Sequence, residues 1–110
     1  MEPRKRLAVE EEENLTVITF LDAKILNDQT IEEIGKQLHD IADQVKIPHI
    51  IIDWKHVENI KVSILGKLIT LSKRLKERGG RLVLRNVAQG IYEVFEIVKL
   101  DKLFHFQKDV

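Results

Sequence analysis

Ser63 is the residue whose type and position best fit a regulatory chemistry. It stands where a loop gives way to a predicted helix. As a helix N-cap, its hydroxyl oxygen would accept a hydrogen bond from an otherwise unpaired amide, although no capping-box Glu or Gln follows. As a phosphorylation site, it would gain about two negative charges, which the positive end of the helix dipole tolerates. The two roles are compatible.

The residues that usually catalyse reactions or bind metals are few and scattered. None of the four histidines, His39, His49, His56 and His105, has a partner at metal-site spacing. The chain has no cysteine, and no G-x-S-x-G motif surrounds Ser63. The other serine, Ser72, falls on an apolar helical stripe and is expected to pack. We therefore expect no catalytic residue, no metal site and no cofactor.

Two aspartates and a tryptophan have more than one interpretation. Asp22 and Asp53 each follow a predicted strand and could lie at the same end of a sheet, but strand-end aspartates commonly form turns. Trp54 could be an exposed recognition residue or a packed anchor. The sequence leaves these alternatives open.

Two neighbouring elements must position Ser63. Residues 49–54 contain three consecutive isoleucines, and such a β-branched run favours a strand covered on both faces. The helix that follows carries one apolar stripe at three- and four-residue spacings, made by Ile64, Leu65, Leu68, Leu71, Ser72 and Leu75. Gly79 is expected to end this helix in the left-handed conformation.

The remaining elements predict an α/β fold. Residues 7–13 and 15–21 are expected to form an antiparallel hairpin, and a helix is expected over residues 28–45 with a cap at Asn27. A strand over 81–86, a helix that opens at Gln89, and a last strand within 103–106 follow. The order β-β-α-β-α-β-α-β implies a mixed sheet of four to five strands packed with three or more helices.

Length and composition set the broad class. At 110 residues we expect a single domain over residues 1–110, with frayed ends at 1–6 and 107–110. The formal net charge of zero gives no general electrostatic case for nucleic acid or for an anionic membrane as a partner. We see no apolar run of membrane-spanning length and no signal peptide, so a cytoplasmic location is the default expectation.

The whole pattern resembles the STAS domain, the family of bacterial anti-sigma-factor antagonists, from about residue 7 to residue 106. The best-matched pieces are residues 50–57, residues 65–69 and residues 73–84. The closing segments 91–95 and 100–104 also look like the last helix and strand of the family. The order and spacing of these pieces carry the resemblance, because none of them is a strict motif.

The resemblance implies a mixed sheet with helices, no enzymatic activity, and binding to an anti-sigma factor that is a serine kinase. In well-known members, that kinase phosphorylates a serine in an Asp-Ser-Ser-Gly-Leu segment, and the phosphorylated form releases the kinase. Ser63 falls on the phosphoacceptor position. Lys61, Val62 and Ile64 replace the Asp, the first Ser and the Gly of that segment. The implied partner-binding surface comprises Asp22, Lys61, Val62, Ser63, Ile64 and Lys67.

Three functions remain open at this point. The first is an anti-sigma-factor antagonist that is switched by phosphorylation of Ser63, where Lys61 could stabilise the phosphate. The second is a non-phosphorylated scaffold module in a larger signalling assembly, with a possible homo-oligomer, which the altered residues around Ser63 motivate. The third is a small-ligand-sensing module, because the sequence does not exclude a ligand pocket.

Overall fold

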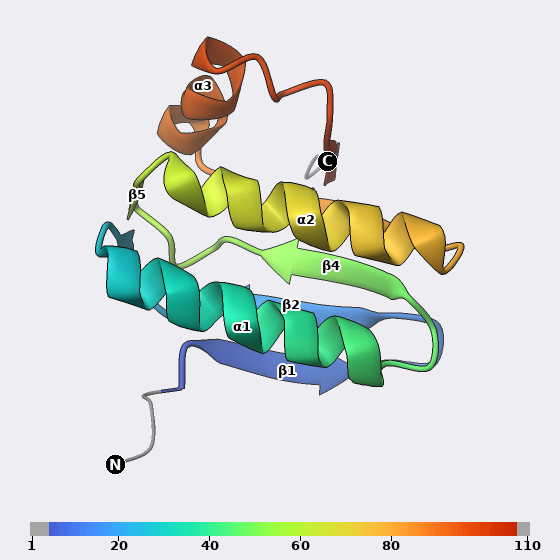
Figure 1. The fold of residues 1–110 in the computed structure, drawn as a ribbon. Coiled ribbons are helices and arrows are strands. Elements are labelled where there is room, and N and C mark those ends of the chain that lie inside the picture. The colour runs from blue at the N-terminus through green and yellow to red at the C-terminus, as the bar shows by residue number, and fades with distance from the viewer. Residues whose placement is uncertain (1–4, 108–110) are drawn as a thin grey trace.

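The computed structural model describes residues 5–107, which contain a five-stranded mixed sheet and three helices (Figure 1). The strand order is β1-β2-β4-β6-β7. These strands are β1 (Leu7–Glu11), β2 (Thr16–Phe20), β4 (His49–Asp53), β6 (Arg81–Arg85) and β7 (His105–Gln107). β1 and β2 form the predicted antiparallel hairpin, and the other neighbours pair in parallel. The predicted α/β fold with a mixed sheet is confirmed.

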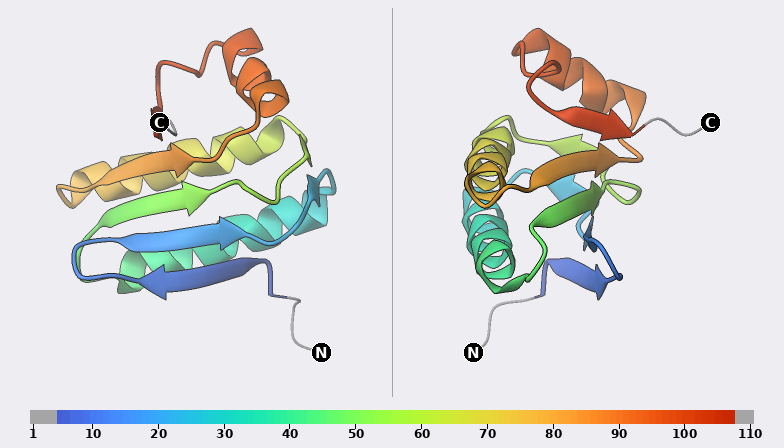
Figure 2. Two further views of the ribbon diagram at one scale, coloured as in Figure 1. Left: turned by 180° about the vertical axis from the view of Figure 1, so that it is seen from behind. Right: turned by 90° about the vertical axis from the view of Figure 1, so that its right-hand side faces the viewer.

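Two long helices cover the same face of this sheet. α1 (Asp28–Gln44) and α2 (Ser63–Glu77) lie side by side and run along the direction of the strands, and the third helix, α3 (Gln89–Ile97), lies beyond the β6 and β7 end of the sheet (Figure 2). The core fills the space between the sheet and the two long helices. Ile34 and Leu38 of α1 meet Leu68 and Leu71 of α2 there, all at most 1% exposed. The predicted apolar stripes therefore face the sheet.

The three isoleucines of β4 do not share one environment. Ile50 and Ile52 are buried under the helices, but Ile51 is only half-buried, on the opposite face of the sheet. In the view from behind, no helix lies over that face (Figure 2). The expectation that this strand is covered on both faces is therefore wrong, because α1 and α2 both pack on the same side.

A second, two-stranded sheet was not predicted. β3 (Lys24–Ile25) and β5 (Asn59–Ile60) pair in parallel beside the N-terminal ends of α1 and α2. Each strand has only two residues, so neither shows a periodicity that a sequence pattern could reveal. This small sheet ties the segment before α1 to the segment before α2.

A tight turn leads from α2 into β6. Gly79 has a φ of +78°, as expected for the residue that ends the helix. Gly80 packs against Pro48, the residue just before β4, and an added Cβ would lie 1.9 Å from the Pro48 carbonyl oxygen. This close approach allows the backbone amide of Arg81 to donate to the same oxygen at 3.1 Å.

Two residues of the expected frayed ends, Arg6 and Gln107, take part in contacts within the fold. Arg6 forms ion pairs with Asp22 and Glu33, and Gln107 belongs to β7, which begins later than the predicted strand. The remaining residues of the expected frayed ends, 1–4 and 108–110, lie outside the described residues. Among residues 5–107, none of the helices has the length and apolar character needed to cross a lipid bilayer.

Candidate functional site

Ser63 is the first residue of α2, and its side chain is exposed to solvent. The expectation that it caps the helix is wrong, because the preceding Val62 already has helical backbone angles of −54° and −30° and no side chain caps this end. Instead, the amide of Ile64 donates to the Lys61 carbonyl, and the amide of Leu65 donates to the Val62 carbonyl. These tight turns satisfy the first amides without the serine hydroxyl.

The small β3–β5 sheet holds Ser63 in place. The amides of Glu58 and Asn59 both donate to the Ala23 carbonyl, at 2.7 and 3.1 Å. The amide of Lys61 donates to the Ile25 carbonyl at 2.8 Å. The loop before α2 is therefore fixed by its own backbone to the segment that precedes α1. Residues on both helix ends consequently share one surface.

A groove of about 300 Å³ opens between the N-terminal halves of α1 and α2, and Ser63 lies on its wall. We call it the α1–α2 groove; its lining residues are Asp28, Ile31, Glu32, Ser63, Gly66, Lys67 and Thr70. The helices come close here because α1 carries Gly35, over which the aliphatic part of Lys67 lies. A Cβ on Gly35 would lie 2.8 Å from Cδ of Lys67. Lys67 therefore crosses from one helix to the other.

Two ion pairs bridge the helices beside Ser63. Nζ of Lys61 lies 2.7 Å from Oδ1 of Asp28, and Nζ of Lys67 lies 2.9 Å from Oε1 of Glu32. Both carboxylates are largely exposed, so each pair contributes at most about 1 kcal/mol to stability. Their more informative property is balance: two cations and two anions are paired near the start of α2. Any new charge on Ser63 would disturb that balance.

Exposed apolar side chains flank the same helix end. Val62 is 49% exposed and Leu26, the residue after β3, is 48% exposed. Leu26 was missed by the sequence analysis, because a single apolar residue in a connector carries no pattern. The pairing of β3 with β5 is what places Leu26 beside the start of α2. Apolar groups left in water beside a charged groove are typical of protein-binding surfaces.

The structure does not bring all the predicted partner-binding residues to this surface. Lys61, Val62, Ser63 and Lys67 lie together around the start of α2. Ile64 is fully buried in the core, so the expectation that it contacts a partner is wrong. Its side chain lies on the inward-facing apolar stripe of α2, directly after the exposed Ser63.

Asp22 belongs to a separate ion cluster. Its Oδ1 accepts a hydrogen bond from Nη1 of Arg6 at 3.0 Å, and Nε of Arg6 donates to Glu33 at 3.1 Å. Partial burial would lower the pKa of Arg6, but the hydrogen bonds to Glu33 and Asp22 raise it above its usual value. Asp22 is not among the residues that line the α1–α2 groove. Asp22 ties Arg6 to the segment after β2, while Glu33 ties Arg6 to α1.

Asp53 forms a turn at the end of β4, which decides between its two interpretations. Its carboxylate accepts hydrogen bonds from the Lys55 amide at 2.9 Å, from Asn86 at 3.1 Å and from Arg85 at 3.1 Å. Burial alone would raise the pKa of Asp53, but these three donors lower it below its usual value. The carboxylate is thereby held ionised as a structural acceptor.

Trp54 is a packed anchor, because its side chain is fully buried. It meets Phe20 and Phe95 edge to face, with ring centroids 5.0 and 6.0 Å apart. Ser72 is also buried, as expected of a packing residue. Among residues 5–107, no three His, Asp or Glu side chains gather where they could hold a metal ion.

Comparison with known proteins places this geometry in a family. A family model described as "STAS domain" matches residues 6–110. Among solved structures, an anti-sigma-factor antagonist (STAS) domain protein from Planctomyces limnophilus is 25% identical, with a TM-score of 0.80 over 94% of this chain and 91% of that one. An anti-sigma factor antagonist from Mycobacterium paratuberculosis is 17% identical, with a TM-score of 0.79 over 94% and 86% of the two chains.

A third similar structure is the phosphorylated form of SpoIIAA, a cell fate determinant of Bacillus. It is 18% identical, with a TM-score of 0.69 over 94% of this chain and 92% of that one. At this identity the likeness concerns the fold alone, whereas the family match spans nearly the whole sequence. The chain belongs to the STAS domain family.

Proposed function

We propose that the protein is an anti-sigma-factor antagonist that binds an anti-sigma kinase through the N-terminal end of α2. Phosphorylation of Ser63 switches this binding off. The observation that carries the proposal is the position of Ser63: it is exposed at the start of α2, next to the exposed Val62, on the wall of a groove that both acidic and basic side chains line. In this role the chain is a binding partner and a substrate of the kinase, and it is not itself an enzyme.

Two exposed apolar residues supply the contact area in the unphosphorylated form. Val62 and Leu26 each leave about half of their surface in water, and a partner that covers both would remove that surface. The ion pairs of Lys61 and Lys67 stand at the rim of this patch. Rim charges set orientation and partner choice more than they set affinity. The arrangement supports a docking surface centred on Val62.

The charge on the groove supplies the switch. Without phosphate, the two lysines balance Asp28 and Glu32. A phosphate on Ser63 would add about two negative charges next to these carboxylates. Lys61 and Lys67 are the two cations beside Ser63, so the phosphate would attract each of them away from its carboxylate. The rim would then carry unpaired acidic groups, and a partner fitted to the balanced surface would be repelled.

The solved structures support the same reading by analogy. SpoIIAA has been solved as an anti-sigma factor antagonist in its unphosphorylated form and also in a phosphorylated form. This chain resembles both in fold, with TM-scores of 0.77 and 0.69. The analogy raises the expectation of a phosphorylation switch, and the geometry around Ser63 supplies the residues that would carry it.

The first experiment tests the modification. The purified protein is incubated with ATP and the anti-sigma kinase encoded by the same genome, and intact mass is measured. We expect a gain of one phosphoryl group in the wild type and in Ser72→Ala, which removes the other serine. We expect no gain in Ser63→Ala. A phosphoryl group that persists in Ser63→Ala would overturn the assignment of Ser63.

The second experiment separates charge from shape. Ser63→Asp adds a negative charge, while Ser63→Asn adds a side chain of the same size without charge. Binding to the kinase without ATP is measured by calorimetry. We expect Ser63→Asn to bind within about threefold of the wild type and Ser63→Asp at least about tenfold more weakly, which is 1.4 kcal/mol. Equal binding by the two variants would contradict a switch based on charge.

A further inference from the structure

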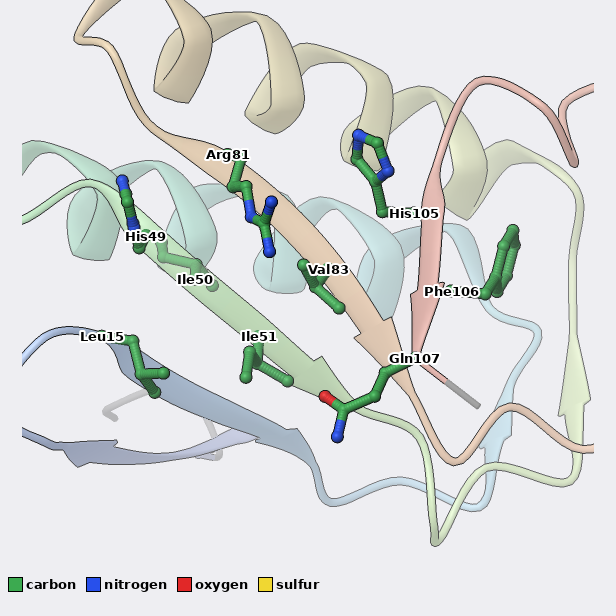
Figure 3. Close-up of a pocket in the computed structure, with 9 residues that line it drawn as sticks. All are labelled: Leu15, His49, Ile50, Ile51, Arg81, Val83, His105, Phe106 and Gln107. Carbon is green, nitrogen blue, oxygen red and sulfur yellow. The ribbon is translucent and has the colours of Figure 1, made fainter. Parts of the chain in front are cut away.

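The face of the sheet opposite α1 and α2 has an unusual pattern of side chains. An antiparallel or mixed sheet with one wet face normally presents polar residues there. Here, apolar residues stand in the middle of the face: Val17 on β2, which is only 6% exposed, and the half-buried Ile51 on β4 and Val83 on β6. A hollow of about 450 Å³ lies over this region, lined among others by Leu15, Ile51 and Val83 (Figure 3).

The strand registers align these residues in a single row across all five strands. Glu10 pairs with Val17, Val17 with Ile51, Ile51 with Val83, and Val83 with His105. The row therefore reads, from β1 to β7, as Glu10, Val17, Ile51, Val83 and His105. We call it the open-face row. Its two ends are exposed, and the two outer positions carry an acidic and a basic side chain.

The charged residues beside the open-face row also divide into an acidic side at β1 and a basic side at β4, β6 and β7. On the β4, β6 and β7 side, His49 and Arg81 stand next to each other, because these two residues are register partners. On the β1 side, Glu12 and Glu13 follow the strand in an exposed turn. Arg85 also belongs to the basic side, but it is occupied by Asp53. One half of the face is thus acidic, the other is basic, and an apolar strip lies between them.

Such a face complements a second copy of itself. We propose that two copies of this chain pack through their open faces about a twofold axis that runs parallel to the strands over β4. This rotation exchanges the two ends of the open-face row. Glu10 of one copy then faces His105 of the other, Val17 faces Val83, and Ile51 faces its own equivalent. Every contact occurs twice, as in any twofold interface.

The charges select this axis over the alternative. A twofold axis perpendicular to the strands would place β1 over β1 and β7 over β7. Glu10 would then oppose Glu10, so the β1 end of the interface would repel, and Arg81 would lie over Arg85 of the other copy. Aligned packing of two sheets also matches the usual geometry of face-to-face sheets, which are about 10 Å apart.

The size of the face sets the expected strength. Five strands about 4.8 Å apart, four of them five residues long and β7 three residues long, give a patch of at most roughly 24 by 17 Å. Such a patch buries roughly 800 Å² over the two copies, below the range of about 1,200–2,000 Å² for stable interfaces, so a weak, reversible dimer is expected. The open face lies on the opposite side of the sheet from α1 and α2. The dimer therefore leaves Ser63 and the α1–α2 groove free on each copy.

Sedimentation velocity from about 10 to 500 μM tests the proposal, with three charge variants. Glu10→Lys places a cation opposite His105, and His105→Glu places an anion opposite Glu10. Each single change is expected to weaken the dimer about tenfold, because Glu10→Lys removes the carboxylate that faces the imidazole in both symmetry-related contacts, and His105→Glu places two carboxylates opposite each other in both. The double variant, Glu10→Lys with His105→Glu, restores opposite charges and is expected to recover dimerisation.

Control variants keep the result interpretable. Glu77→Lys makes the same charge change at the exposed end of α2 and should leave the dimer unchanged. All substituted positions are exposed, so circular dichroism should show an unaltered fold. A protein that is monomeric at 500 μM overturns the proposal. So does a dimer that is insensitive to the two single variants, or one that the double variant fails to restore, because either would place the interface elsewhere or give it another axis.

Discussion

Replacement of Asp53 by Asn should destabilise the protein strongly, although the two side chains have nearly the same shape. The Asp53 side chain is 3% exposed and accepts from three donors on Lys55, Arg85 and Asn86. An asparagine oxygen could still accept from the Lys55 amide. Its NH2 group, however, would face the Arg85 guanidinium, so two donors would oppose each other without an acceptor.

The magnitude follows from these contacts. Loss of one charge-assisted hydrogen bond and weakening of the others should cost about 2–3 kcal/mol in the free energy of unfolding. For a domain of this size, such a loss lowers Tm by roughly 10 °C or more. Asp53→Ala leaves all three donors without a partner and should cost about 3–5 kcal/mol.

The stabilisation should also depend on pH with a definite sign. Because the pKa of Asp53 is lower in the folded than in the unfolded protein, its contribution is complete above the unfolded value of about 3.9. It is lost as the pH falls through the lower, folded value. The gap in stability between the wild type and Asp53→Asn should therefore be constant near neutral pH and shrink in acid.

Urea unfolding at low protein concentration, followed by circular dichroism at several pH values from about 7 to 3, measures both effects. Asp43→Asn is the matched control, because it makes the same chemical change at an exposed ion pair with Arg74 and should cost less than about 1 kcal/mol. If Asp53→Asn costs no more than Asp43→Asn, or if the gap stays constant into acid, the reasoning about this carboxylate is refuted.

Two further predictions concern glycines. Gly80→Ala should lower the free energy of unfolding in urea by about 3 kcal/mol or more, because its Cβ would lie 1.9 Å from the backbone oxygen of Pro48. Gly79→Ala is the control: its φ is positive but its surroundings are open, so it should cost roughly 1–2 kcal/mol, and a similar cost for Gly80→Ala would refute this prediction. Gly35→Ala should raise Tm slightly, because alanine stabilises a helix by about 1 kcal/mol relative to glycine, which is more than the exposed Lys67–Glu32 ion pair contributes. The new methyl group would displace the Lys67 side chain, and a clear fall in Tm would show that this side chain cannot move aside.

The elements of the fold could be predicted where the sequence has a sustained period. The apolar stripes of α1 and α2 are long enough to indicate helices, and the run of isoleucines in β4 favoured a strand because it is short and β-branched. β3 and β5 could not be found, because two residues carry no period and their pairing is set by tertiary structure. The coverage of β4 was predicted wrongly, since a run of isoleucines does not reveal on which side each helix will pack.

The candidate site shows a different limit. Ile64 entered two predictions: the helical stripe placed it inside, and the family resemblance placed it on the partner surface. The structure confirms the first and excludes the second. One of the two interpretations of Ser63 made it the cap of α2, but Val62 has helical backbone angles, which no residue-type preference predicts. Leu26 was missed because its exposure depends on the β3–β5 pairing rather than on any local pattern.

The β3–β5 pairing has a consequence for any enzyme that modifies Ser63. Peptide substrates often adapt to an active-site cleft by becoming extended, but the segment before Ser63 is already committed to hydrogen bonds with Ala23 and Ile25. Extending it would require breaking that ladder and unwinding the start of α2. The modifying enzyme must therefore recognise an assembled epitope drawn from distant parts of the chain. A synthetic peptide with the local sequence alone would lack most of what is recognised.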